Sequence, residues 1–77
     1  MELAELIMER AINIKRELIG NYDIIVLMNQ HDVFEILTSK EAYPYCTNTP
    51  DKRIFDMPII VSNDVPKGNP KLVVEFR

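Results

Sequence analysis

The chain has 77 residues, of which 47% are hydrophobic, and it carries nine Lys and Arg against twelve Asp and Glu. A chain this short buries roughly 60% of the surface that its unfolded form exposes, so we expect a single domain over residues 1–77 with one thin core rather than a disordered segment. The net charge of −3 and the scattered basic residues argue against nucleic acid as a partner, because clustered cations bind a phosphate backbone.

Membrane contact is not expected either. The longest uninterrupted apolar run, Ile24–Met28, has five residues, whereas a membrane-spanning helix needs about 20. The first residues, Met-Glu-Leu-Ala-Glu, are acidic and lack the basic start of a signal peptide, which predicts a cytoplasmic protein. Cys46 is the only cysteine and cannot form an internal disulfide. Oligomerisation is a common source of stability for so small a chain, so self-association in a homo-oligomer stays an open alternative.

A helical period opens the chain. The apolar residues at spacings of four and three are Leu3, Ile7, Ala11, Ile14 and Leu18, and they predict a helix over about residues 2–19 with Gly20 as a left-handed cap. Leu6, Met8, Ile12 and Ile19 widen this apolar stripe. The width favours a helix that lies across its own sheet over a coiled-coil zipper, with contact to a second partner as an alternative.

A strand and a second helix follow. Residues 23–28 are β-branched and continuously apolar after Asp23, which predicts a central strand covered on both faces. Asn29 is a favourable N-cap for a helix that ends near residue 38 or 39, and Asp32 stands near its positive end. The predicted buried side of this helix consists of Val33, Phe34, Ile36 and Leu37.

The remaining sequence predicts a loop and two strands. Residues 40–52 contain two prolines and no sustained period, as expected for a loop that is functional or mobile. Strands at 54–62 and 72–76 flank a segment rich in turn formers and predict a long-looped hairpin, with Pro58 on an edge or at a bulge. The predicted class is α+β, a single sheet of about three strands with two helices packed on it, in the order helix-strand-helix-strand-strand.

Residues able to carry catalysis or hold a metal are scarce. His31 and Cys46 are the only residues of their kinds, whereas a structural zinc site needs about four such ligands. His31 falls in the first turn of a predicted helix and Cys46 in a loop, so a surface histidine and an incidental cysteine are favoured over a catalytic dyad. Two glycines do not form a phosphate-binding loop. We expect no catalytic site, no metal site, no cofactor and no enzymatic activity.

The chain is therefore expected to act through its surfaces. The first candidate is the broad apolar stripe of the first helix. The second is Tyr43-Pro44-Tyr45, because aromatic side chains stiffened by proline are effective anchors at protein interfaces. Tyr43 and Tyr45 are the predicted partner-binding residues, and folding back to seal the core is the alternative for both.

Two segments resemble a known family. Residues 23–29, Asp-Ile-Ile-Val-Leu-Met-Asn, resemble the "val-met-asn" strand that precedes a helix in HK97-type tailed-phage major capsid proteins. Residues 54–68 resemble their "leu-phe-gly-x-pro-val-x-x-ser-x-x-x-pro-x-gly" hairpin, with Asp56 where the family usually has glycine. The resemblance is colinear and covers the axial domain of those proteins. The peripheral domain, extended loop and N-terminal arm have no counterpart, so we expect something other than a complete capsid subunit.

The resemblance implies a small phage or prophage protein that is located in the host cytoplasm or in the virion. The expected function is then that of a non-enzymatic virion structural or assembly component that works by protein–protein contact. The alternative is a small phage or bacterial binding module that binds or inhibits a host protein. A similarity reached through common strand and turn chemistry is a third explanation, since similarity of fold does not determine function.

Overall fold

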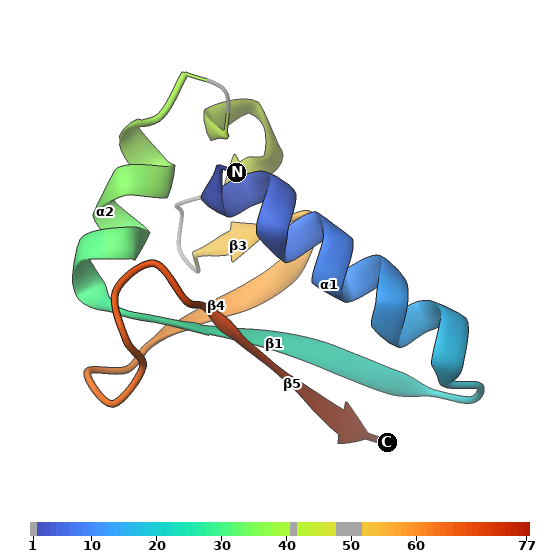
Figure 1. The fold of residues 1–77 in the computed structure, drawn as a ribbon. Helices are drawn as coiled ribbons and strands as arrows, with labels where there is room; N and C mark the ends of the chain where they lie inside the picture. The colour runs from blue at the N-terminus through green and yellow to red at the C-terminus, as the bar shows by residue number, and fades with distance from the viewer. Residues whose placement is uncertain (1, 41, 48–51) are drawn as a thin grey trace.

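Two α-helices pack on one sheet, which confirms the predicted α+β class (Figure 1). The computed structural model describes residues 2–40, 42–47 and 52–77. In chain order the elements are α1 (Leu3–Glu17), β1 (Tyr22–Met28), α2 (Gln30–Thr38), the 3₁₀ helix η1 (Tyr43–Tyr45), β2 (Cys46–Thr47), β3 (Arg53–Ile54), β4 (Met57–Val61) and β5 (Lys71–Phe76). The long elements follow the predicted order, and the two-residue strands β2 and β3 raise the strand count above the expected three.

Helix α1 covers its own sheet, as its apolar stripe predicts. Ala4, Ile7 and Ala11 are buried, one turn apart along the face toward the sheet. The helix ends at Glu17, because Leu18 is already extended with φ −110° and ψ 136°. Gly20 is therefore not the helix cap. Its φ of +120°, which glycine adopts without steric strain, serves the turn into β1 instead.

The sheet has the strand order β2-β3-β4-β1-β5. β1 pairs in parallel with β4 and antiparallel with β5, so its prediction as a central strand is confirmed. The predicted hairpin of the last two strands is wrong, because β1 lies between β4 and β5. Insertion of β1 gives its buried backbone N–H and C=O groups partners on both sides, which a β4–β5 hairpin would not provide.

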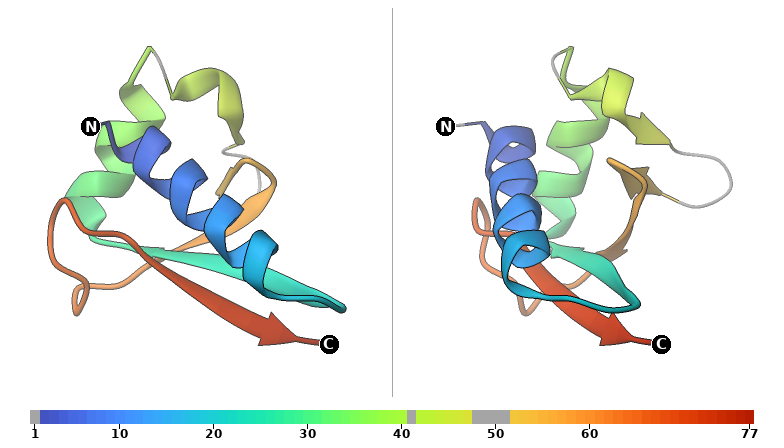
Figure 2. Two further views of the ribbon diagram at one scale, coloured as in Figure 1. Left: turned by 45° about the vertical axis from the view of Figure 1, so that its right-hand side comes forward. Right: turned by 90° about the vertical axis from the view of Figure 1, so that its right-hand side faces the viewer.

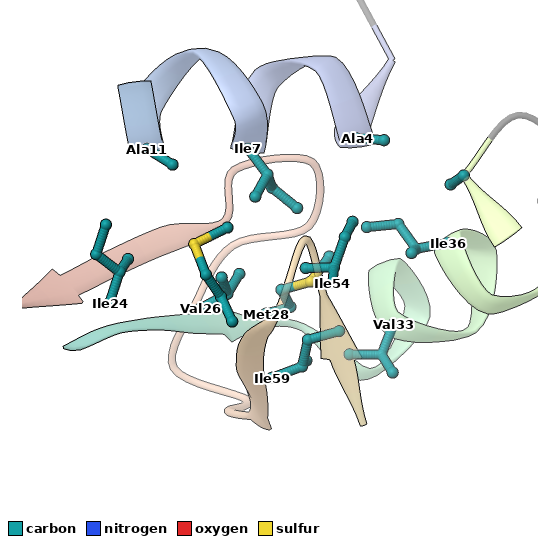
Figure 3. Packing of buried hydrophobic residues seen from close by; sticks show 12 residues of the cluster. Ala4, Ile7, Ala11, Ile24, Val26, Met28, Val33, Ile36, Ile54 and Ile59 are labelled. Carbon is teal, nitrogen blue, oxygen red and sulfur yellow. The ribbon is translucent and has the colours of Figure 1, made fainter. Parts of the chain in front are cut away.

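Both helices lie on the same face of the sheet, as the two views of Figure 2 show. Ile24, Val26 and Met28 of β1 are buried toward the helices, where they meet Ile7 of α1 and Ile36 of α2 (Figure 3). The expectation that β1 is covered on both faces is wrong, because two helices suffice for one face only.

The other face of the sheet, called the uncovered face below, has apolar residues at its centre. Ladder partners share a face, so Ile25 and Leu27 of β1 stand there beside Ile60 of β4 and Val73 of β5. Ile60 is exposed and the other three are half-buried. The continuously apolar sequence of β1 thus serves a helix-covered face and a partly exposed one.

Helix α2 begins as predicted. The side chain of Asn29 accepts a hydrogen bond from the backbone N–H of His31 at 3.0 Å, which satisfies one of the free donors at the helix start. Val33 and Ile36 are buried, but Phe34 is 69% exposed, which contradicts its predicted place on the buried side. Phe34 follows Val33 directly and therefore points about 100° away from it around the helix.

The connection from β4 to β5, residues 62–70, crosses the end of β1 and is held by both helices. Asp32, in the first turn of α2, is only 1% exposed and accepts a hydrogen bond from the Gly68 N–H at 2.6 Å. Asn29 Nδ2 donates to the carbonyl of Val65 at 3.2 Å, and Arg10 of α1 donates to the carbonyl of Pro70. A segment dense in turn formers is thus ordered by side chains far away in sequence.

Pro58 lies in an interior strand, which corrects its predicted place at an edge or a bulge. It pairs with Arg53 of β3, next to the close Ile54–Met57 pair that flanks the turn. The ladder with β1 begins one residue later, at Ile59, whose N–H bonds the carbonyl of Lys52 at 2.9 Å. Pro58 therefore occupies a position where no backbone donor is needed.

The segment predicted as a loop over residues 40–52 contains regular structure. Helix η1 and strand β2 lie within it, and β2 pairs antiparallel with β3 through Cys46–Ile54 and Thr47–Arg53. Two-residue strands carry too little pattern to be predicted from sequence. Residues 41 and 48–51 of the predicted loop lie outside the described residues.

Candidate protein-binding surface

His31 and Cys46, the candidate pair for nucleophilic and general-base chemistry, lie on different elements. His31 is exposed in the first turn of α2 and Cys46 is half-buried in β2, and burial raises the pKa of the Cys46 thiol. A raised pKa lowers the fraction of thiolate, which is the nucleophilic form. Over residues 2–40, 42–47 and 52–77, no three His, Cys, Asp or Glu side chains come together in a way that would hold a metal ion.

An unusual turn joins β3 to β4. Phe55 and Asp56 are its two central residues, and both have positive φ, +48° and +67°. This is the conformation of the two-residue hairpin turn that Asn-Gly adopts most readily, and a bulky residue such as phenylalanine adopts it at a cost. Asp56 stands where the capsid pattern has glycine, a residue with no strain at this φ. The strained Phe55 therefore needs contacts that hold it.

Tyr45 provides those contacts. The N–H of Phe55 donates to the carbonyl of Tyr45 at 2.9 Å, and the two rings stack with centroids 5.0 Å apart and planes 30° from parallel. A stacked aromatic pair contributes about 0.5–1.5 kcal/mol beyond its buried area, which offsets part of the strain. Tyr45 is nevertheless 53% exposed, so much of this stabilised pair faces outward.

Two shallow hollows continue from the stack onto α1. One of about 260 Å³ is lined by Glu2, Ala4, Glu5, Met8, Tyr45 and Phe55. The other, of about 440 Å³, follows α1 and is lined by Glu5, Met8, Glu9, Ile12, Asn13 and Arg16. Met8 and Ile12 are 41% and 43% exposed. We call Met8, Ile12, Tyr45 and Phe55 the aromatic–methionine patch.

The border of the patch is acidic. Glu2 and Glu5 line the first hollow and Glu9 joins Glu5 in the second, against a single cation, Arg16. Within the part of the chain that the structure describes, none of these glutamates forms an ion pair. Exposed aromatic and methionine side chains with unpaired carboxylates around them suit a partner that presents apolar residues beside basic ones.

The structure brings the two surfaces named from the sequence together. Met8 and Ile12 come from the widened stripe of α1, and Tyr45 from the predicted partner-binding segment. The side chain of Tyr43 lies outside the described residues, so its predicted role stays a prediction. Phe55 was missed as a surface residue, because only its backbone bond to Tyr45 and its positive φ place it there. The adjacent Phe-Asp within a resembled hairpin was the one available signal.

Comparison with known proteins adds no relative: no protein-family model, no curated protein and no solved structure matches the chain. Among the described residues, neither helix has the length and apolar character required to traverse a membrane.

Proposed function

We propose that the protein acts without catalysis, by binding a protein partner at the aromatic–methionine patch. The observation that carries this proposal is the Tyr45–Phe55 stack, in which Tyr45 is exposed and the half-buried Phe55 has a strained, positive φ. Strained backbone persists where its surroundings maintain it, and it is common at ligand-binding sites. The stack supplies a rigid anchor, and Met8 beside it adapts to the shape of a partner.

The chemistry of the border defines the partner class. Glu2, Glu5 and Glu9 favour a segment with Lys or Arg beside its apolar side chains. Such contacts are screened by salt, so binding should weaken as ionic strength rises.

Two biological settings are compatible with this binding role. The first is a virion structural or assembly component of a phage or prophage, and its support is the colinear resemblance of residues 23–29 and 54–68 to capsid axial domains. The second is a small module that binds or inhibits a host protein, and its support is the acidic border of the patch. A component of the first kind co-purifies with particles, whereas a module of the second kind stays small and is retained with one host protein.

A displayed random-peptide library selected against the protein tests the binding role. We expect enriched peptides that combine apolar residues with Lys or Arg. These peptides should lose affinity for Phe55→Asn, which removes the stack and places at this position a residue that tolerates a positive φ. Phe34→Ala is the control for loss of an aromatic side chain, since Phe34 is exposed and lines neither hollow.

The melting temperature of Phe55→Asn separates loss of binding from loss of folding. A folded Phe55→Asn variant that binds the selected peptides as tightly as the Phe34→Ala control would refute the patch as the binding surface. Selection that enriches no peptide with both apolar and basic residues would refute the proposed partner class.

A further inference from the structure

A second interaction surface lies along strand β5, at one edge of the sheet. β5 is the last strand in the sheet order, and within the described residues only β1 pairs with it (Figures 1 and 2). One row of its backbone N–H and C=O groups therefore has no ladder partner. β5 is six residues long and contains no proline, so its free edge is able to accept another strand.

Charges mark the two ends of this edge. On the uncovered face β5 presents Lys71, Val73 and Glu75 in sequence, with the charged residues exposed. Glu75 stands directly opposite Asp23 of β1, and Arg77 is engaged with Asp23 rather than with Glu75. Among the described residues neither Lys71 nor Glu75 forms an ion pair. The free edge thus carries one unpaired cation and one unpaired anion, two residues on either side of Val73.

We propose that two copies of the chain pair antiparallel along the free edges of β5, with Val73 on the two-fold axis. In this register Lys71 of each copy lies opposite Glu75 of the other, and Val73 lies opposite its own symmetry mate. On the helix-covered face Leu72 lies opposite Val74, so the half-buried apolar residues of β5 are covered further. The two sheets become one continuous sheet, and Lys71 and Glu75, which form no ion pair within the described residues, each acquire a partner.

Charge selects this register from its neighbours. A two-fold axis perpendicular to the sheet pairs residues of the same face, so the register changes in steps that place successive residues on the axis. With Val74 on the axis, Lys71 would meet Arg77 and Val73 would meet Glu75, a repulsive and an unfavourable pair. With Leu72 on the axis, Lys71 would meet Val73 instead of Glu75. Pro70, which has no N–H to donate, would then stand opposite Val74 and end the ladder after three residues, whereas with Val73 on the axis it falls beyond the Lys71–Glu75 pair. The inference does not depend on the aromatic–methionine patch, which lies on other elements.

Sedimentation equilibrium at increasing protein concentration tests the proposal through reciprocal charge reversal. The wild type should form a dimer, while Lys71→Glu and Glu75→Lys each place like charges opposite each other twice and raise the dimer dissociation constant at least about tenfold. An equal mixture of the two variants restores both attractive pairs, as does the double variant. Both positions are exposed strand residues, and far-UV circular dichroism verifies that each variant is folded.

A wild type that stays monomeric at all concentrations would overturn the proposal. So would a dimer that the single reversals leave unchanged, or a mixture that associates no better than either variant alone. Phe55→Asn should leave the dimer intact, and the charge reversals should leave peptide binding intact. Failure of one surface is therefore distinguishable from failure of the other.

Discussion

Asp32 is expected to be the side chain on which the crossing connection depends most. It is 1% exposed in the first turn of α2, and its Oδ2 accepts from the Gly68 N–H at 2.6 Å. A hydrogen bond to a charged group contributes about 1.5–3 kcal/mol, and a carboxylate near a helix N-terminus about 0.3–1 kcal/mol more. We therefore expect Asp32→Ala to lower the free energy of unfolding by about 2–4 kcal/mol.

This loss is large for so small a protein. At roughly 0.05–0.15 kcal/mol per residue, the whole chain has a free energy of unfolding of about 4–12 kcal/mol. Asp32→Asn keeps the shape and one acceptor but removes the charge, so it should lose about half as much as Asp32→Ala. Asp64→Ala is the matched control. Asp64 is an exposed aspartate of the same connection, and its replacement should change stability by less than about 0.5 kcal/mol.

Equilibrium unfolding in urea, followed by far-UV circular dichroism, measures all three variants. The slope of free energy against urea should stay constant, so the midpoint reports stability directly. The melting temperature should fall by about 4–8 °C for each kcal/mol lost. If Asp32→Ala loses no more than Asp64→Ala, the hydrogen bond to Gly68 does not hold the connection and the reasoning is refuted.

Three further predictions concern the β3–β4 turn, the Asp23–Arg77 pair and Cys46. Asp56→Gly should raise the free energy of unfolding by about 0.5–1 kcal/mol, because glycine tolerates the φ of +67°. The urea midpoint should rise with it, and a lowered midpoint would contradict the inferred strain at Asp56. Hydrogen bonds from Arg77 hold the pKa of the Asp23 carboxyl below its ordinary value, so the stabilisation is present above the ordinary carboxyl range and disappears as pH falls through the lowered pKa. The difference in melting temperature between wild type and Arg77→Gln should accordingly shrink from about pH 6 to about pH 2, and a constant difference would argue against the pair. Burial raises the pKa of Cys46, so iodoacetamide should modify it more slowly in the native chain than in urea; faster native modification would show an activated thiol.

Periodicity was a sound guide to the regular elements and to part of the candidate site. The spacing of Ile7 and Ala11 predicts α1, the cap at Asn29 predicts the start of α2, and the apolar run before it predicts a central strand. The over-wide apolar stripe that includes Met8 and Ile12, and the aromatic pair beside proline that includes Tyr45, indicate surface candidates from the sequence. Phe34 was misplaced, because a short helix leaves its buried arc poorly defined.

The sequence by itself thus determined the long helices and strands, where α2 begins, and that one thin α+β core forms. Only the tertiary structure decided that β1 separates β4 from β5, that both helices share one face, and that Phe55 stacks on Tyr45. The physical reason is that the spacing of apolar side chains indicates which face of a helix or strand is buried. The order of the strands depends instead on backbone hydrogen bonds, which nearly every residue can form and which leave no pattern in the sequence. Asp32 illustrates the same limit, since nothing near it in sequence indicates the bond to Gly68 that keeps it buried.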